Sequence, residues 1–275
     1  MSPSVDPVDP VDPGRFASDD PSAINQAAAV GFERGAGDYE QARPSYPVAA
    51  VELVIDVLGL APGRRLLDLA AGTGKFTRLV AASGAELVAV EPVAAMRDEL
   101  VARVPGVEAL DGRAEELPLA DGSVDAVVAA QAFHWFDAPR ALAEVHRVLR
   151  VDGRLALVWN VRNERVDWVR RFGEILVAAA GRKPYEDGTD WRAVVADTGG
   201  FGPLQHERFV YDQSIDADLL VQRAASTSFV SALPDGPRAR CLDEVRELTR
   251  THPDLAGRDT FVFPYFTDVF WCGRV

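Results

Sequence analysis

The residues in this 275-residue chain whose types and spacing could support chemistry are two carboxylates, two glycines and a histidine. Asp68 lies just before Gly72 and Gly74, and Glu91 follows after enough residues for one helix and a returning strand. A turn with two glycines lets backbone N–H groups at a helix start approach a ligand closely. The carboxylates could accept hydrogen bonds from an ammonium group or from paired hydroxyls. His134 belongs to the residue type that exchanges protons near neutral pH.

The elements that would position these groups are visible in the hydrophobic pattern. A short apolar run over 66–69 predicts a strand, and Phe76, Leu79 and Val80 recur at helical spacing after the glycines. A second apolar run, 87–90, predicts the strand that ends at Glu91. Because ligands bind at the carboxyl ends of strands in an open parallel sheet, we expect the glycine turn and Glu91 to lie side by side.

Two nucleotide-binding motifs fit the glycine turn less well. A phosphate-binding P-loop requires glycine where Leu69 stands and a hydroxyl residue where Phe76 stands. A dinucleotide fingerprint would place its third glycine at Thr77, and it does not account for the carboxylate within the strand. The first motif is excluded and the second is weakened.

The pattern D-x-A-x-G-T-G over 68–74 resembles the first motif of class I S-adenosylmethionine (SAM)-dependent methyltransferases. The resemblance implies an α/β fold: a Rossmann-like, doubly wound, mostly parallel sheet of seven strands, the last antiparallel, with a helical cap insertion. It also implies that SAM is the cofactor and S-adenosylhomocysteine (SAH) the product. In that family the acidic residue of the motif anchors the ammonium group, and the acid ending the second strand holds the ribose.

Two further stretches are similar to one subgroup of that family, which includes trans-aconitate methyltransferases. They are Y-x-x-x-R-P-x-Y-P over 39–47 and A-x-H-W-F-D over 132–137. DNA amino-methyltransferases carry a different tetrapeptide after the fourth strand, which is absent here. Arg113 stands where the family often has an adenine-binding Asp, so backbone at 113–114 or Glu115 would have to take that role.

The resemblance, joined to the residue types, gives a set of expected site residues. His134 and Trp135 are the expected catalytic residues, with His134 either a base or a positioning group. The expected substrate-binding residues are Tyr46, Trp159, Asn160 and Arg162, and Arg43, Arg162 or Arg165 could hold a carboxylate. The expected cofactor-binding residues are Tyr39, Arg43, Asp68, Ala70, Gly72, Thr73, Gly74, Glu91, Pro92, Met96, Arg113, Ala114, Glu115, Gln131, Ala132 and Phe133.

The resemblance implies a methyltransferase (EC 2.1.1.-) that acts by in-line displacement on a small molecule, with a carboxylate or hydroxyl as acceptor. Two alternatives stay open. One is a protein that binds SAM or SAH but catalyses another reaction or regulates. The other is a nucleotide-dependent oxidoreductase or a simple binding module on a similar sheet.

The composition of the chain limits the classes of binding partner that we expect. A net charge of −13 and a pI near 4.8 argue against nucleic acid and anionic membrane surfaces, because phosphate binding draws on an excess of Lys and Arg. The two cysteines, Cys241 and Cys272, are too few to indicate a disulfide framework or a metal cluster. No apolar run approaches the about 20 residues of a membrane span, and no signal-peptide pattern opens the chain. We therefore expect a cytoplasmic monomer or homodimer without a metal.

The predicted domain organisation is a leader and one domain. Residues 1–30 contain Val-Asp-Pro three times and little apolar surface, which predicts a disordered leader. Residues 31–275 form the predicted methyltransferase domain. Its cap is expected at about 183–203 and 213–258, because the helical stretch between the sixth and seventh strands is too long for a hairpin.

Overall fold

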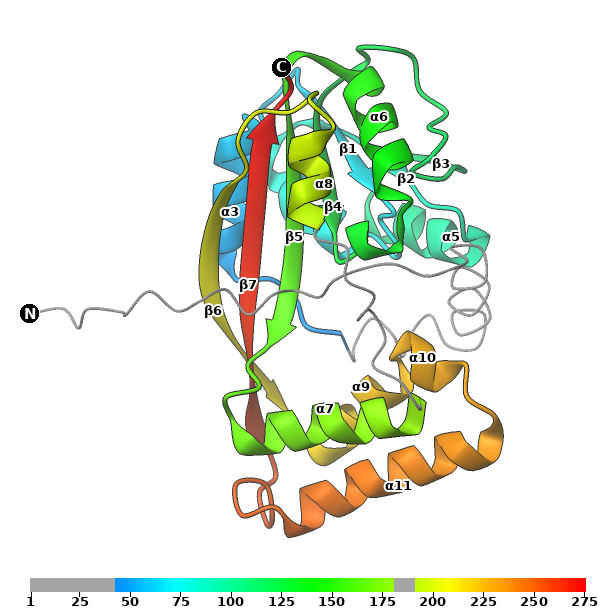
Figure 1. Ribbon diagram of the computed structural model, residues 1–275, viewed down its shortest axis with the longest axis vertical. Coiled ribbons are helices and arrows are strands. Elements are labelled where there is room, and N and C mark those ends of the chain that lie inside the picture. The colour runs from blue at the N-terminus through cyan, green and yellow to red at the C-terminus, as the bar shows by residue number, and fades with distance from the viewer. Residues whose placement is uncertain (1–42, 181–190) are drawn as a thin grey trace, which may run out of the picture.

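The computed structural model describes residues 43–180 and 191–275. The predicted leader, Tyr39 and residues 183–190 of the expected cap lie outside these ranges. Seven strands form one mixed sheet (Figure 1). They are β1 (Arg65–Leu69), β2 (Glu86–Val90), β3 (Glu108–Leu110), β4 (Val124–Ala130), β5 (Leu149–Arg162), β6 (Gln205–Ile215) and β7 (Phe261–Gly273).

The strand order is β3-β2-β1-β4-β5-β7-β6. Strands β1 to β5 pair in parallel, and β7 runs antiparallel to both β5 and β6. The expected fold class is therefore confirmed, including the antiparallel last strand. Chain order reverses between β1 and β4, and in open α/β sheets ligands bind in the crevice at such a reversal.

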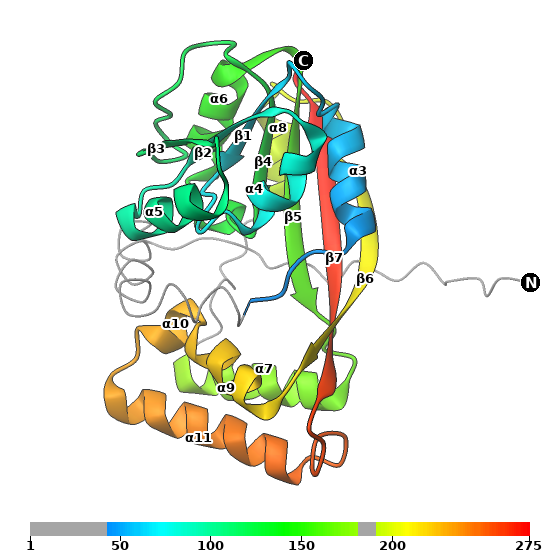
Figure 2. The same ribbon diagram turned by 180° about the vertical axis from the view of Figure 1, so that it is seen from behind.

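The helices divide between the sheet and a separate layer. Figures 1 and 2 show α7, α9, α10 and α11 beyond the carboxyl ends of the parallel strands, while α3 and α6 flank the sheet itself. The helices are α3 (Val48–Leu58), α4 (Lys75–Val80), α5 (Ala94–Arg103), α6 (Ala138–Val148), α7 (Asp167–Ala180), α8 (Trp191–Asp197), α9 (Ala217–Ala225), α10 (Ser228–Ser231) and α11 (Asp235–Thr251), with short 3₁₀ turns η1 (Ala81–Ser83) and η2 (Phe133–Trp135).

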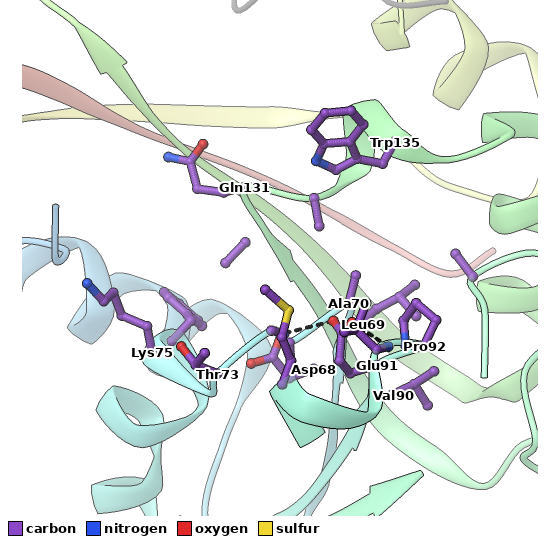
Figure 3. Close-up of a pocket in the computed structure, with 18 of the residues that line it drawn as sticks. Asp68, Leu69, Ala70, Thr73, Lys75, Val90, Glu91, Pro92, Gln131 and Trp135 are labelled. Atoms are coloured by element: carbon purple, nitrogen blue, oxygen red, sulfur yellow. Dashed lines mark hydrogen bonds between the residues drawn. The ribbon is translucent and has the colours of Figure 1, made fainter. Parts of the chain in front are cut away.

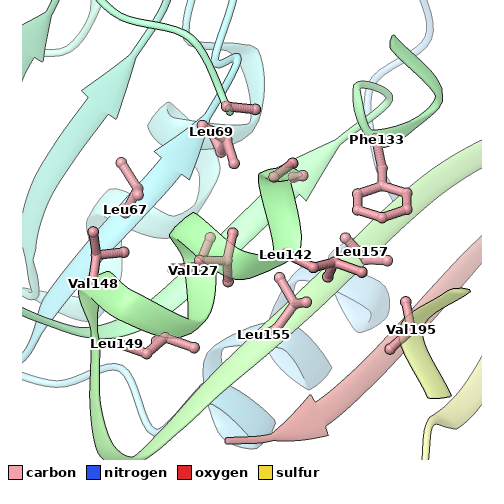
Figure 4. Packing of buried hydrophobic residues seen from close by; sticks show 14 of the residues in the cluster. Leu67, Leu69, Val127, Phe133, Leu142, Val148, Leu149, Leu155, Leu157 and Val195 are labelled. Atoms are coloured by element: carbon pink, nitrogen blue, oxygen red, sulfur yellow. The ribbon is translucent and has the colours of Figure 1, made fainter. Parts of the chain in front are cut away.

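Alternation along the buried strands supplies both faces of the sheet with a core. In β1, Leu66 packs with α3 on one face, whereas Leu67 packs with α6 on the other. Figure 4 shows the second cluster, in which Leu67, Val127 and Leu155 of three neighbouring strands meet Leu142 of α6. Successive side chains of a strand point to opposite faces, so one apolar run fills two layers.

The helical layer has a core of its own. Trp168 and Phe172 of α7, Leu220 of α9 and Val245 of α11 are buried together, with Phe263 of β7 between them. We call α7, α9, α10 and α11 the helical layer. Strands β6 and β7 enter this core at the layer's end, so it is joined to the sheet by continuous backbone.

The cap differs from the expected boundaries at two places. Helix α8, within the expected range 183–203, packs on α6, and its Trp191 contacts Trp159 and Phe270 in the sheet core. Helix α7, which lies outside both expected cap ranges, belongs to the helical layer. The apolar runs 155–159 and 267–272, each of which predicts a strand, cover only parts of β5 and β7, because the antiparallel pairing of these strands continues from Arg154↔Gly273 to Arg162↔Tyr265.

Candidate functional site

A cavity lies where the carboxyl ends of β1, β2, β3 and β4 face the helical layer. Its volume is about 1310 Å³, including the part open to solvent. The segments that follow these four strands form most of its wall, and Arg43 to Tyr46 and Arg223 of α9 complete it. Figure 3 shows Asp68 and Glu91 on one side, with Gln131 and Trp135 across the space.

The glycine turn and the acid of the second strand are joined directly. The backbone N–H of Gly72 donates to Glu91 Oε2 at 3.0 Å, and the N–H of Val93 donates to Oε1 at 2.9 Å. Gly72 has a φ of +58°, a conformation that glycine adopts without steric cost. Burial raises the pKa of the Glu91 carboxyl, although these two N–H donors oppose the shift. The carboxylate therefore fixes the turn and the end of β2 in one arrangement.

Asp68 is the most buried acid of the cavity wall. The residue is 1% exposed, and its Oδ2 accepts a hydrogen bond of 2.6 Å from Thr77 Oγ1. Burial raises its pKa to about 7, and the charge of Glu91 acts in the same direction, while Thr77 opposes it. A positive charge placed beside a carboxyl with such a raised pKa would favour its ionised form. The wall is thus prepared for a positively charged ligand group.

Backbone strain marks the same edge of the sheet. Ala70 and Gln131 have φ values of +55° and +58°, and they directly follow the neighbouring strands β1 and β4. For residues with a Cβ this conformation costs about 1–2 kcal/mol. Both residues line the cavity. Strain stored at adjacent strand ends is typical of ligand sites.

The segment 43–47 crosses the cavity and is held at both sides. Lys75 Nζ donates to the Arg43 carbonyl at 2.7 Å, and Asn160 Nδ2 donates to the Ser45 carbonyl at 2.8 Å. On the opposite side, Arg43 Nη2 donates to the carbonyl of Ser226 at the end of α9, at 2.6 Å. The sheet and the helical layer are therefore bridged over the cavity by this segment.

His134 lies in η2, which follows β4. Trp159 Nε1 donates to His134 Nδ1 at 3.4 Å, which favours the tautomer with its proton on Nε2. Burial and, secondarily, the positive charge of Arg43 lower the pKa of His134 to about 3. The ring is accordingly neutral at physiological pH, and a group of such low basicity is a weak proton acceptor. This arrangement suits positioning better than general-base catalysis.

Sixteen of the expected site residues line the cavity, and six of the described ones do not. Gly74 instead packs against Leu100, and Phe133 and Trp159 lie in the aromatic part of the sheet core. His134, Arg162 and Arg165 stand outside the wall. The lining residues are Arg43, Tyr46, Asp68, Ala70, Gly72, Thr73, Glu91, Pro92, Met96, Arg113, Ala114, Glu115, Gln131, Ala132, Trp135 and Asn160.

Glu115, one of the candidates for adenine recognition, is already engaged. Its Oε1 accepts from the backbone N–H of Asp137 at 2.9 Å, which ties the loop after β3 to the start of α6. Its Oε2 lies 3.7 Å from Arg113 Nε. The backbone at 113–114 is left as the simpler partner for a ligand at this end of the cavity.

Arg223 is a cavity residue that the sequence analysis did not single out. It follows Leu219 and Leu220 of α9 by four and three residues, so it shares a helix face with apolar side chains. An arginine on the apolar face of an amphipathic helix can indicate a binding site, because a cation that is removed from water requires a compensating partner. This pattern of residues can be recognised in the sequence alone.

Comparison with known proteins identifies the family of the chain. A family described as "Methyltransferase domain" matches residues 67–157, the span from β1 to β5. An uncharacterized methyltransferase of Mycobacterium tuberculosis is 43% identical over 239 residues, which cover 87% of this chain and 93% of that protein. An uncharacterized methyltransferase-like protein of Schizosaccharomyces pombe is 34% identical over 241 residues, covering 87% and 93%.

Solved structures show the same fold. A putative methyltransferase from an antibiotic biosynthesis pathway of Anabaena variabilis superimposes with a TM-score of 0.62 at 22% identity, covering 83% of this chain and 98% of that one. A putative type II methyltransferase from Anaeromyxobacter dehalogenans gives a TM-score of 0.62 at 25% identity, covering 84% and 97%.

Proposed function

Because the chain belongs to the family of SAM-dependent methyltransferases, we propose that it methylates a small-molecule acceptor at a carboxylate or hydroxyl oxygen. The observation that carries the proposal is that Asp68 lies on the same wall of the cavity as Gly72 and Glu91, which are joined by a hydrogen bond. This wall offers a buried acid for an ammonium group and a second acid for ribose hydroxyls, at the end of the sheet where ligands bind.

The residues present fit SAM. Asp68 would accept from its ammonium group beside the turn at Gly72 and Thr73, and Glu91 would accept from the ribose hydroxyls. Met96 and the backbone at Arg113 would contact the adenine. When bound, SAM supplies a methyl group on a positively charged sulfur, which is open to in-line attack.

The rest of the wall would align the acceptor and exclude water, which are the main tasks in such a displacement. Tyr46 and Asn160 are fixed, the first by packing edge-on against Phe76 and the second by its contacts to Ser45 and Thr267. Trp135 would provide an apolar surface. A carboxylate acceptor would need no base, and neutral His134 would then orient its neighbours.

The test is calorimetric titration of the full-length protein with SAM, SAH and NAD(H). We expect SAM and SAH to bind and NAD(H) not to bind; the reverse result would remove the proposal. Asp68→Ala and Glu91→Ala should each weaken SAH binding by about 10-fold or more, since deleting a charged hydrogen bond costs about 1.5–3 kcal/mol. Glu86→Ala, an exposed acid at the start of the same strand as Glu91, is the matched control.

Transfer itself requires a second experiment. Labelled SAM would be incubated with a panel of carboxylic and phenolic acceptors, and products would be measured by mass. Methyl ester or methyl ether formation is the expected outcome. Binding of SAH without transfer to any member would favour a protein that uses the nucleoside for another reaction or for regulation.

We also propose a cytoplasmic location. Cys241 and Cys272 are both buried free thiols, as suits a reducing compartment. Within residues 43–180 and 191–275, no helix has the length and apolar character that crossing a membrane requires.

A further inference from the structure

The wall of the cavity formed by the helical layer carries a guanidinium with unsatisfied nitrogens. Arg223 of α9 lines the cavity, and its Nε and Nη1 are shielded from solvent. Neither atom has a hydrogen-bond partner among the residues that the structure describes. Shielding two donors of a cation from water without giving them acceptors costs free energy, so their retention needs a compensating group.

Two further polar groups, Arg162 and Tyr265, lie in the same region. Arg162, at the end of β5, lies close enough to Arg223 for the two positive charges to repel; burial and this repulsion lower the pKa of Arg162. The carboxylate of Glu164 is 3.5 Å from Arg162 and half exposed. Tyr265, the cross-strand partner of Arg162, is 1% exposed, and its hydroxyl has no hydrogen-bond partner in the described chain. The two Arg223 nitrogens and the Tyr265 hydroxyl are therefore donors without an acceptor among the described residues, whereas Arg162 is paired with Glu164.

The side of the cavity formed by the sheet carries residues of both charges, namely Asp68, Glu91, Glu115, Lys75 and Arg113. The side toward the helical layer carries Arg43 and Arg223, and no carboxylate among the described residues lines it. The two buried acids, Asp68 and Glu91, suit a cationic nucleoside. The basic side suits an anion, and this occurs in a chain whose net charge is −13, so an excess of bases here is not a consequence of composition.

We propose that Arg223 binds an oxyanion of the methyl acceptor, a carboxylate or a phosphate, and that the positive charge of nearby Arg162 adds to the attraction. A guanidinium presents N–H donors in a fork that matches both oxyanions. This inference rests on the proposed function and narrows it: the acceptor is anionic and is anchored by the helical layer. The nucleoside is held by the sheet.

The test uses the full chain saturated with SAH. Glutarate, inorganic phosphate and the neutral glutaramide are titrated separately into the wild-type protein and into Arg223→Gln, Arg223→Lys and Arg240→Gln. Arg240 is an exposed arginine of α11 and serves as the matched control. Glutarate and phosphate distinguish a carboxylate from a phosphate ligand, and glutaramide has the size of glutarate without its charge.

We expect glutarate or phosphate to bind the wild type and Arg240→Gln alike. Binding should weaken at least 10-fold in Arg223→Gln and recover in part in Arg223→Lys. Binding of neither anion, binding that survives Arg223→Gln, or equal binding of glutaramide would overturn the inference. SAH affinity is measured in the same samples. If neither anion binds but SAH does, only the anion site is refuted. If SAH does not bind, the proposed function is refuted.

Folding is checked in the same variants by thermal unfolding. Arg223→Gln removes a guanidinium with unpaired buried nitrogens, so we expect its midpoint without ligand to equal or exceed that of the wild type. A large fall in the midpoint would show that Arg223 supports the helical layer structurally, and it would count against a ligand-binding role.

Discussion

Replacing Asp68 by asparagine should stabilise the ligand-free protein while removing its affinity for the cofactor. Asp68 is 1% exposed, and its pKa is raised from 3.8 to about 7. A raised acid pKa means that the folded state retains a proton that the unfolded state has already lost. Between pH 3.8 and 7, folding therefore becomes less favourable as pH rises, and the full penalty is present above pH 7.

The size of that penalty follows from the shift. One pKa unit corresponds to about 1.4 kcal/mol, so ionisation of Asp68 lowers the free energy of unfolding of the wild-type protein at pH 8 by at most about 4 kcal/mol. The Asp68→Asn variant would avoid it, because an amide is neutral and its oxygen can still accept the hydrogen bond from Thr77 Oγ1. The stabilising effect should be small at pH 4, grow through pH 5 and 6, and level off above pH 7.

The assay is urea unfolding of both proteins at pH 4, 5, 6, 7 and 8, with and without SAH. Added SAH should stabilise the wild type but not Asp68→Asn, because the ammonium group loses its carboxylate. A variant less stable than the wild type at pH 8, or a stability difference that does not change with pH, would contradict the reasoning. Retained SAH stabilisation would show that Asp68 does not hold the cofactor.

Three further predictions concern the glycine turn, the histidine and the second acid. Gly74→Ala should lower the free energy of unfolding, measured in urea, by about 1–3 kcal/mol, because the φ of Gly74 is +76° and a Cβ there would lie 3.0 Å from Leu100 Cγ. Gly72→Ala should lower the affinity for SAH more than it lowers stability. His134→Gln should reduce turnover and leave the pH profile of kcat between pH 6 and 9 unchanged, because a pKa of about 3 places its ionisation outside that range; loss of a titration step there would refute the assignment. Glu91→Gln should weaken SAH binding measured by calorimetry, and unchanged affinity would place the ribose elsewhere.

Most of the sheet was predictable because its signals are local. The apolar run before Asp68, the two glycines and the acid at the end of the next apolar run define β1, α4 and β2 within a short stretch of chain. Parallel strands buried on both faces read as continuous hydrophobic runs. The position of Glu91 beside Gly72 then follows from the parallel register of β1 and β2.

The parts that were missed depend on contacts between distant segments. Strand β7 begins at Phe261, well before the predicted start, because β6 pairs with it along its whole length and even accommodates Pro264 opposite Asp212. The residues on both sides of Pro264 are aromatic or β-branched types that favour strands, but a proline argues against a strand that continues through it. Likewise, Trp191 resembles a loop or cap residue in sequence, yet it is 2% exposed against the aromatic side chains of β5 and β7.

Roles within the site were harder to assign than its location. Gly74 and Phe133 follow the family pattern, but one packs against a helix and the other fills the core. A motif records which residues the local fold requires as well as which residues touch a ligand. Arg223 shows the reverse case, since no motif includes it and only the tertiary contact of α9 brings it to the cavity.

Strands β5, β6 and β7 extend from the sheet into the helical layer, and β6 and β7 stay paired over the full length of β6. The two sides of the cavity, the sheet and the helical layer, are thus connected by the same paired strands. A hinge motion that separated the two sides would have to bend or disrupt these strands. The hydrogen bond from Arg43 to the Ser226 carbonyl, by contrast, is a contact between the two sides that can break without disturbing these strands, and we expect ligand entry to depend on it.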